Sequence, residues 1–110
     1  MSETLPKTYY ITTPIYYVNG LPHVGSALTT IVCDVLARYH RLKGEQTFLL
    51  TGTDENATKV TQAAEKAGVP PMEFVDGLAG AFKECWGALH IANNDFVRTT
   101  EPRHTLAVQE

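Results

Sequence analysis

Side chains suited to binding an anion gather where a loop of the chain gives way to a predicted helix. The stretch PHVGS places His23, Gly25 and Ser26 at this junction. Unpaired amides and the helix dipole favour an anion at a helix N-terminus, and a glycine lets a ligand come close to the backbone. The imidazole and the hydroxyl add donors, which suits phosphate. The alternative is structural, with Ser26 as a helix cap and His23 as an ordinary loop histidine.

A second candidate is a carboxylate at the end of a predicted strand. Asp54 follows the apolar run QTFLLT, within the sequence TGTDE. Loops that follow parallel strands converge beyond the carboxyl edge of the sheet, so Asp54 should face the same crevice as His23. A carboxylate there could hold a substrate ammonium group. The alternative is that Asp54 caps the following helix, with Glu55 favourable to the dipole of that helix.

Several common signatures are absent from the sequence. Neither GxGxxG nor GxxxxGK[ST] occurs, and no nucleophile has an evident base. Cys33 and Cys85 form no CxxC pair, and His40 and His104 lack partners at metal-ligand spacing. We therefore expect reduced thiols and no metal site in these residues.

The elements that must position the candidate residues are predicted to alternate between strand and helix. A strand over residues 8–13 precedes a loop over 14–22, and a helix runs from Ser26 to a stop at Gly44. A strand over residues 46–51 follows. This order implies a right-handed crossover between two parallel strands, and hence an α/β fold.

The rest of the chain continues the alternation. Helices are predicted over residues 57–66 and 70–89, a strand over 96–99, and a last helix that begins within residues 100–102 and still runs at 110. Two helices carry apolar stripes that predict core-facing sides. The stripes are Leu28, Ile31, Val32, Val35, Leu36, Tyr39 and Leu42 in the first helix, and Phe74, Leu78, Phe82, Trp86 and Leu89 in the third.

Length and composition fit one globular domain. The chain has 110 residues, of which 44% are hydrophobic and 19% charged, and it leaves no room for a second complete domain. A net charge of -3 argues against a chain held to nucleic acid by electrostatics alone. Residues 1–8 lack the features of a signal or transit peptide, and no apolar run approaches the roughly 20 residues of a membrane span. We expect a cytoplasmic protein with no membrane contact.

Longer stretches around both candidate sites match the pattern of a known family. They are TPIYYVNGLPHVGSA, DVLARYHRLKG, FLLTGTDE, FVDGLAGAFKECW and DFVRTTEPRH. Together they resemble the start of the methionyl-tRNA synthetases, which are class I aminoacyl-tRNA synthetases. Residues 23–26 fall on the His-Ile-Gly-His signature of the class, and residues 51–55 fall on a TGTDE segment of many bacterial-type members.

The resemblance implies that residues 1–110 are the incomplete N-terminal portion of a Rossmann-like catalytic domain. Members of the family activate methionine with ATP to methionyl-adenylate and transfer methionine to tRNA(Met). Catalysis of this attack on the α-phosphate depends on positioning and on charge stabilisation. ATP would enter with Mg²⁺ as a substrate. The second signature, Lys-Met-Ser-Lys-Ser, most of the tRNA-binding surface and any zinc site would lie downstream of residue 110.

The resemblance also assigns roles by position. His23, Gly25 and Ser26 would bind ATP, and His23 and Ser26 would be catalytic. Ile15 and Tyr17 would border the methionine, whose ammonium group Asp54 would bind. One departure is Ser26, which stands where the signature has its second histidine and is a shorter donor that carries no charge.

Two hypotheses remain open for the chain as a whole. It is either a piece of a methionine-tRNA ligase, inactive and marginally stable by itself, or a stand-alone nucleotide- or protein-binding module without ligase activity. Specificity for leucine, isoleucine, valine or cysteine is a weaker alternative, because TPIYYVNG and TGTDE favour methionine.

Overall fold

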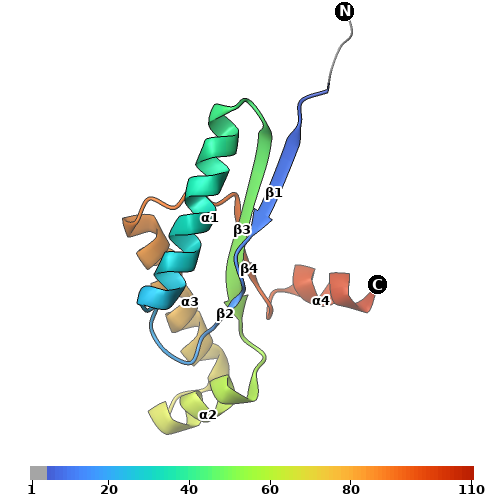
Figure 1. The fold of residues 1–110 in the computed structure, drawn as a ribbon. Helices are drawn as coiled ribbons and strands as arrows, with labels where there is room; N and C mark the ends of the chain where they lie inside the picture. Colours follow the sequence, from blue (N-terminus) through green and yellow to red (C-terminus); the bar gives the residue numbers. More distant parts are fainter. Residues whose placement is uncertain (1–4) are drawn as a thin grey trace, which may run out of the picture.

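The computed structural model describes residues 5–110, which form a parallel β-sheet with helices packed against it (Figure 1). The predicted absence of a leader concerns residues 1–8, of which 1–4 lie outside the described residues. The α/β class is confirmed. In chain order the elements are β1 (Thr8–Thr12), β2 (Tyr16–Tyr17), α1 (Val24–Leu42), β3 (Gln46–Asp54), α2 (Thr58–Ala67), α3 (Pro71–Ala88), β4 (Asp95–Arg98) and α4 (Pro102–Gln109).

The strand β3 is the centre of the sheet, and every strand paired with it is parallel. β1 pairs with its first half, from Thr8 opposite Gln46, and β2 pairs with its end, where Tyr17 lies opposite Asp54. β4 pairs with residues 50–53 of β3. The predicted loop over 14–22 therefore contains a short strand, and β3 runs three residues past its predicted end at 51.

Gly52 lets β4 approach β3 closely. A Cβ atom on Gly52 would lie 2.1 Å from the carbonyl oxygen of Val97 and 2.7 Å from its Cγ1. Such separations are far below van der Waals contact, so any side chain at Gly52 would push the two strands apart. The approach brings the carboxyl ends of β3 and β4 together.

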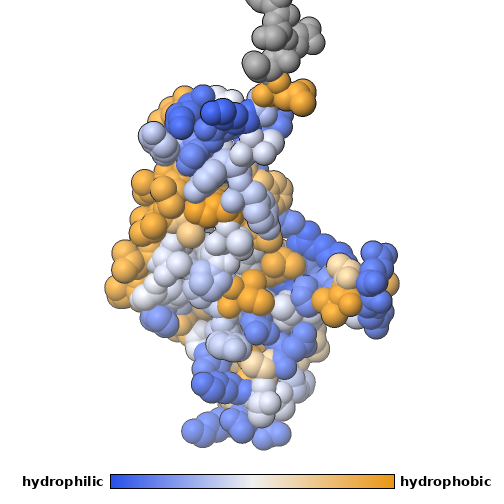
Figure 2. Space-filling model, turned by 45° about the vertical axis from the view of Figure 1, so that its right-hand side comes forward, coloured by the Kyte–Doolittle hydropathy of each residue, from blue (hydrophilic) through white to orange (hydrophobic). Residues whose placement is uncertain are grey.

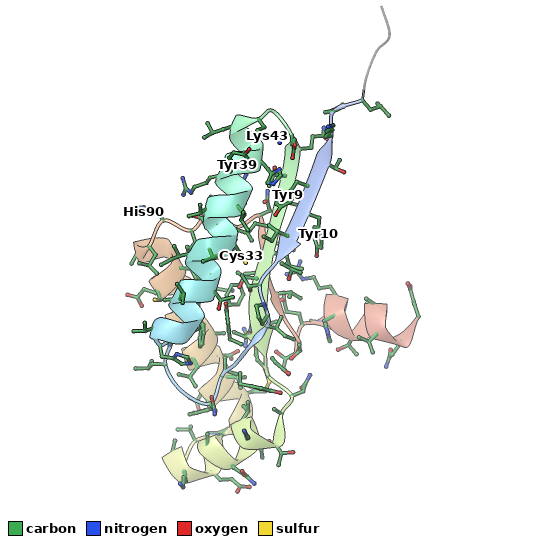
Figure 3. The ribbon with its side chains drawn as sticks, in the orientation of Figure 1. Tyr9, Tyr10, Cys33, Tyr39, Lys43 and His90 are labelled. Atoms are coloured by element: carbon green, nitrogen blue, oxygen red, sulfur yellow. The ribbon has the colours of Figure 1, made fainter. Side chains whose placement is uncertain are left out.

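Residues of β1 alternate between the two sides of the sheet, as the period of a strand requires. Tyr9 points toward α1 (Figure 3). Its ring stacks on that of His40, with 3.5 Å between the ring centroids. Tyr10 points to the other side of the sheet, where its ring centroid lies 5.8 Å from that of Phe48 in β3, and the residue is 62% exposed. His40, for which the sequence indicated no role, also pairs through Nδ1 with Glu45.

Two buried clusters hold the layers together. The smaller one joins α1 to β3 through Cys33, Ala37 and Leu49, and the larger one joins α2 and α3 to the segment after β2. The larger cluster consists of Val18, Val60, Val75, Phe82 and Trp86. It includes the middle of the predicted α3 stripe, whereas Leu89 at the end of that stripe is 42% exposed.

The predicted core face of α1 is wrong. All seven residues of its apolar stripe are exposed, by between 40% and 89% of their surface. The buried side of the helix consists of Ser26, Thr30, Cys33, Asp34 and Ala37. These short side chains let α1 lie close to β3, and the stripe forms part of the apolar surface of the molecule (Figure 2). Within residues 5–110, no helix is both long and apolar enough to cross a membrane.

Candidate functional site

His23 is the N-cap of α1, so the helix begins at Val24 rather than at Ser26 as predicted. The Nδ1 atom of His23 accepts a hydrogen bond of 3.0 Å from the Gly25 N–H. Because Nδ1 is the acceptor, the proton of the neutral ring lies on Nε2. The imidazole is therefore held over the first turn with its other nitrogen as a donor.

Ser26 completes the cap. Its hydroxyl accepts a hydrogen bond from the His23 N–H at 3.1 Å and donates one to the His23 carbonyl oxygen at 3.0 Å. The residue is only 5% exposed. This geometry supports the capping alternative, and the hydroxyl would have to release the His23 oxygen before it could donate to a phosphate. A catalytic role for Ser26 stays a prediction.

Gly25 leaves room for the ring of His23. A Cβ atom on Gly25 would lie 2.8 Å from Cε1 and 3.1 Å from Nδ1 of His23. An alanine there would displace the imidazole from the cap. The predicted approach of ATP to the backbone at Gly25 stays a prediction.

A cavity of about 340 Å³ opens beside the N-terminus of α1. Four of the predicted site residues line it, namely Ile15, Tyr17, His23 and Ser26, and Phe82 of α3 lines it as well. Its volume falls within the roughly 300–1,000 Å³ of small-ligand sites. Gly25 and Asp54 are not among its lining residues.

Asp54 ends β3 directly opposite Tyr17, at the carboxyl edge of the sheet. The alternative that it caps α2 is wrong, because the N-cap of α2 is Ala57 and makes no side-chain hydrogen bond. Among the described residues, the Asp54 carboxylate accepts one long hydrogen bond, at 3.4 Å from the Asn56 N–H. This partly exposed carboxylate is therefore free to meet a cation.

Glu55 is a buried, ion-paired residue, although the sequence suggested only a favourable effect on a helix dipole. Its side chain is 0% exposed and accepts hydrogen bonds from Nε and Nη2 of Arg98, at 2.8 and 2.7 Å. Burial raises the pKa of Glu55, but the hydrogen bonds from Arg98, Thr53 and Thr100 outweigh it, so the pKa lies below its ordinary value. The two-residue period of β3 could have revealed this burial, since Glu55 follows Thr51 and Thr53 on one side.

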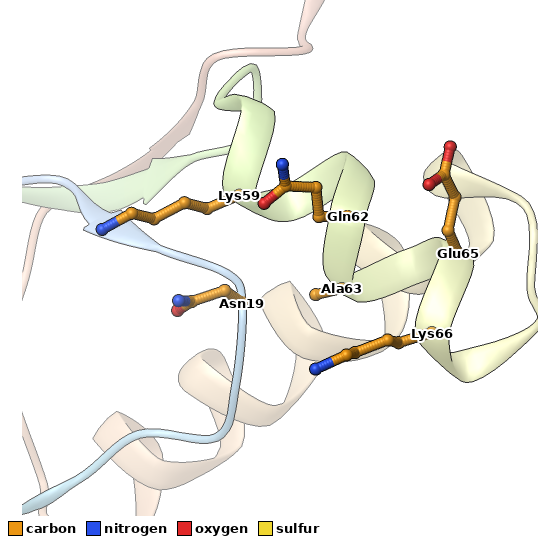
Figure 4. Close-up of a pocket in the computed structure, with 6 residues that line it drawn as sticks. All are labelled: Asn19, Lys59, Gln62, Ala63, Glu65 and Lys66. Carbon is orange, nitrogen blue, oxygen red and sulfur yellow. The ribbon is translucent and has the colours of Figure 1, made fainter.

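A second hollow, of about 770 Å³, lies between α2 and the segment after β2. Lys59 and Lys66 extend from α2 toward Asn19, which also lines the first cavity (Figure 4). The sequence did not single out these lysines. Elsewhere the thiols of Cys33 and Cys85 are free, and no group of three potential metal ligands occurs within residues 5–110.

Comparison with known proteins gives a consistent match along the chain. Residues 9–110 match the family model described as tRNA synthetases class I (M). A methionine-tRNA ligase of Thermotoga maritima is 58% identical over 102 residues, which are 93% of this chain. The ligase of Lactiplantibacillus plantarum is 52% identical over 110 residues, which are all of it. The chain spans only 16% of the length of each relative.

A solved structure is similar as well. The methionyl-tRNA synthetase of Mycobacterium tuberculosis, in complex with methionyl-adenylate, matches with a TM-score of 0.90 at 44% identity. The match covers 92% of this chain and 20% of the mycobacterial one. The predicted fold, the N-terminal portion of a Rossmann-like catalytic domain, is thereby confirmed.

Proposed function

Because this chain belongs to the class I tRNA synthetases specific for methionine, we propose that it supplies the N-terminal part of a site where ATP activates methionine. The complete protein would be a methionine-tRNA ligase, which forms methionyl-adenylate and then transfers methionine to tRNA(Met). The observation that supports this most is the cavity shared by Ile15, Tyr17, His23 and Ser26. The mycobacterial relative with the same fold was solved with methionyl-adenylate.

The phosphates of ATP would bind at the N-terminus of α1. There the Nε2–H of His23 would donate to a phosphate oxygen, next to the positive end of the helix dipole. Ser26 would be a second donor once its hydroxyl turns away from His23, and Gly25 would lie beside the nucleoside. In-line attack by the methionine carboxylate needs such donors to stabilise charge on the phosphoryl group, and it needs no enzyme nucleophile. Mg²⁺ would enter with ATP as part of the substrate.

Methionine would lie near the carboxyl end of β3. Its ammonium group would pair with the Asp54 carboxylate, which has no cationic partner among residues 5–110. Ile15 and Tyr17 would border the methionine, and the pairing of Tyr17 with Asp54 in the sheet supports a shared position. A charge-assisted hydrogen bond would fix the amino acid for attack.

The wider setting is part of the same proposal. Residues 1–110 would belong to one catalytic domain of a cytoplasmic enzyme, with no second domain among them. Other regions of the complete protein would make most contacts to tRNA(Met) and would hold zinc if the enzyme uses it.

Methionine-dependent exchange of pyrophosphate into ATP tests this function. The assay uses the complete product of the gene that encodes these residues, with methionine, leucine, isoleucine, valine and cysteine in turn. We expect exchange with methionine alone. Asp54→Asn should raise the KM for methionine, and His23→Ala should lower kcat roughly 100-fold, as for the loss of one transition-state donor. His104→Ala, on α4, is the matched control and should change neither.

The absence of exchange with every amino acid would contradict the proposal. Titration with ATP alone would then decide whether the protein is a nucleotide-binding module without ligase activity.

A further inference from the structure

Glu55 is a buried carboxylate that the proposed chemistry does not use. Its side chain is 0% exposed and is held by donors from three places: Thr53 in β3 at 2.5 Å, Arg98 in β4, and Thr100 before α4 at 2.9 Å. Burying a charged carboxylate is costly unless it is paired and hydrogen-bonded. These partners therefore hold Glu55, and the backbone around it, in one position.

The backbone on both sides of Glu55 is tied to the end of β4 as well. The Glu55 N–H donates to the Thr99 hydroxyl at 2.7 Å, and the Thr99 N–H donates to the Thr53 carbonyl oxygen at 3.3 Å. The side chain of Asn56 donates to the Thr99 carbonyl oxygen at 3.2 Å. The chain that leaves β3 is thus fastened to the chain that leaves β4.

Asp54 has little support of its own. The side chains of Thr53 and Glu55 are hydrogen-bonded to each other and so lie on one side of the chain. Asp54, between them at the end of the strand, points to the other side. Its hydrogen bond from the Asn56 N–H is 3.4 Å long and comes from only two residues further along the chain. The direction of the Asp54 carboxylate therefore depends on the backbone that Glu55 anchors.

We propose that Glu55 and Arg98 are positioning residues for the Asp54 carboxylate, an inference that rests on the proposed binding of methionine by Asp54. The planar guanidinium of Arg98 binds both carboxylate oxygens of Glu55, so it holds the orientation of the chain at the end of β3. The same guanidinium pairs with Asp76 of α3 at 2.6 Å, which connects the strand end to a helix of the core.

The pair also gives two acids that are adjacent in sequence different electrostatic roles. Arg98 neutralises Glu55, so a substrate ammonium group is attracted by Asp54 and not by the buried neighbour. The effect of losing this arrangement should be specific for methionine, since ATP would bind at the N-terminus of α1.

The test compares the KM for methionine with the KM for ATP in pyrophosphate exchange by the complete protein. Glu55→Gln keeps the shape of the side chain but removes its charge, and it should raise the KM for methionine roughly tenfold, since a displaced orienting group costs about that or more. The KM for ATP should stay within about twofold of its value in the unaltered protein, because the substitution changes no group at the proposed ATP site. Thr100→Ala, which removes one donor and leaves the ion pair, should act in the same direction but less.

The matched control breaks another ion pair, which joins β4 to α4. Asp95→Asn removes the partner of Arg103 at the opposite end of β4, where the Nη1–Oδ2 distance is 2.7 Å, and should change neither KM. Equal increases in both KM values for Glu55→Gln would show that the pair only supports the fold. If Glu55→Gln does not fold, as judged by urea unfolding, Thr100→Ala decides on the same criterion.

The Asp54→Asn variant separates the positioning role of Glu55 from the binding of methionine by Asp54. A raised methionine KM in Asp54→Asn, with no change in either Glu55→Gln or Thr100→Ala, would overturn the positioning role alone. An unchanged methionine KM in Asp54→Asn would overturn the ammonium-binding role and with it this inference.

Discussion

The two ring nitrogens of His23 serve different partners. Nδ1 accepts from the Gly25 N–H and so closes the first turn of α1. This fixes the neutral ring in the tautomer with a proton on Nε2, which is the nitrogen available to a phosphate. The structural role of His23 as a cap therefore does not compete with the proposed phosphate binding, because the cap itself orients the donor.

Ser26 differs in this respect, because its hydroxyl is used by the cap. We expect Ser26→Ala to lower the free energy of unfolding by about 0.5–2 kcal/mol, the usual cost of losing a cap. In the complete protein it should also lower adenylate formation while the KM for methionine stays nearly unchanged. Urea unfolding and pyrophosphate exchange measure the two effects.

Thr29→Ala is the control for Ser26→Ala, since it also deletes a hydroxyl near the start of α1. The only hydrogen bond that it removes is an exposed one to the Gly25 carbonyl oxygen. Exchange at the unaltered rate in Ser26→Ala, despite reduced stability, would leave Ser26 with the capping role alone.

At the scale of an element, the close approach of β3 and β4 should make the sheet sensitive to any side chain at Gly52. We expect Gly52→Ala to lower the free energy of unfolding by about 1–3 kcal/mol or more, as other overpacked sites do, because the added Cβ meets the backbone of Val97. Urea unfolding measures the change. Gly77→Ala in α3, where nothing lies within 4 Å of the new Cβ, should instead stabilise by roughly 0.5–1 kcal/mol. A neutral Gly52→Ala would mean that β4 can shift freely.

The Glu55–Arg98 pair predicts how this part of the sheet responds to acid. The pKa of Glu55 is lowered in the folded protein, so its charge stabilises the fold above the ordinary value of 4.5. That contribution is lost as the pH falls through the lowered pKa. We expect Glu55→Gln to be less stable than the unaltered chain at pH 7 in urea unfolding. The difference should shrink as the pH falls below 4.5 and through the lowered pKa, because protonated Glu55 resembles glutamine.

A difference between the two proteins that stays constant from pH 7 to pH 3 would show that the charge of Glu55 contributes nothing. Glu84→Gln, which removes the charge of an exposed carboxylate on α3, is the control and should change the stability little at either pH.

The sequence predicted most elements because their local signals are strong. Gly44 and Gly68 have positive φ values of 82° and 71° just after their helices, as their positions indicated. The failures are at places decided by tertiary pairing. Tyr16 and Tyr17 form a strand only because β3 extends far enough to pair with them. The periodicity of α1 predicts the helix itself, but it does not say which side of the helix is covered.

The positions of the candidate site residues could be predicted in part. His23 and Ser26 were found because a helix start and a family signature coincide, and the structure places both at one cavity. Glu55 and Arg98 were missed because 42 residues separate Glu55 from its partner, and only the parallel pairing of β3 with β4 brings them together.

At the scale of the whole molecule, the described chain is less compact than a globular domain of the same number of residues. Its radius of gyration is 16.4 Å, whereas a compact domain of this size has about 13 Å. One side of the sheet exposes Tyr10 and Phe48, and the α1 stripe lies on another surface. Apolar surface of this extent is unusual for a monomeric protein in water.

We therefore expect the 110-residue chain on its own to self-associate through the exposed side of α1. Sedimentation velocity at increasing concentration should show species larger than a monomer. Val35→Lys places a charge in the middle of the stripe, where Val35 is 59% exposed, and should shift the distribution toward monomer without loss of helix content. Leu106→Lys on α4, where Leu106 is 64% exposed, introduces the same charge elsewhere and should leave association unchanged. A monomer at every concentration would show that this apolar side is tolerated in water, and equal effects of both variants would place the contact outside α1.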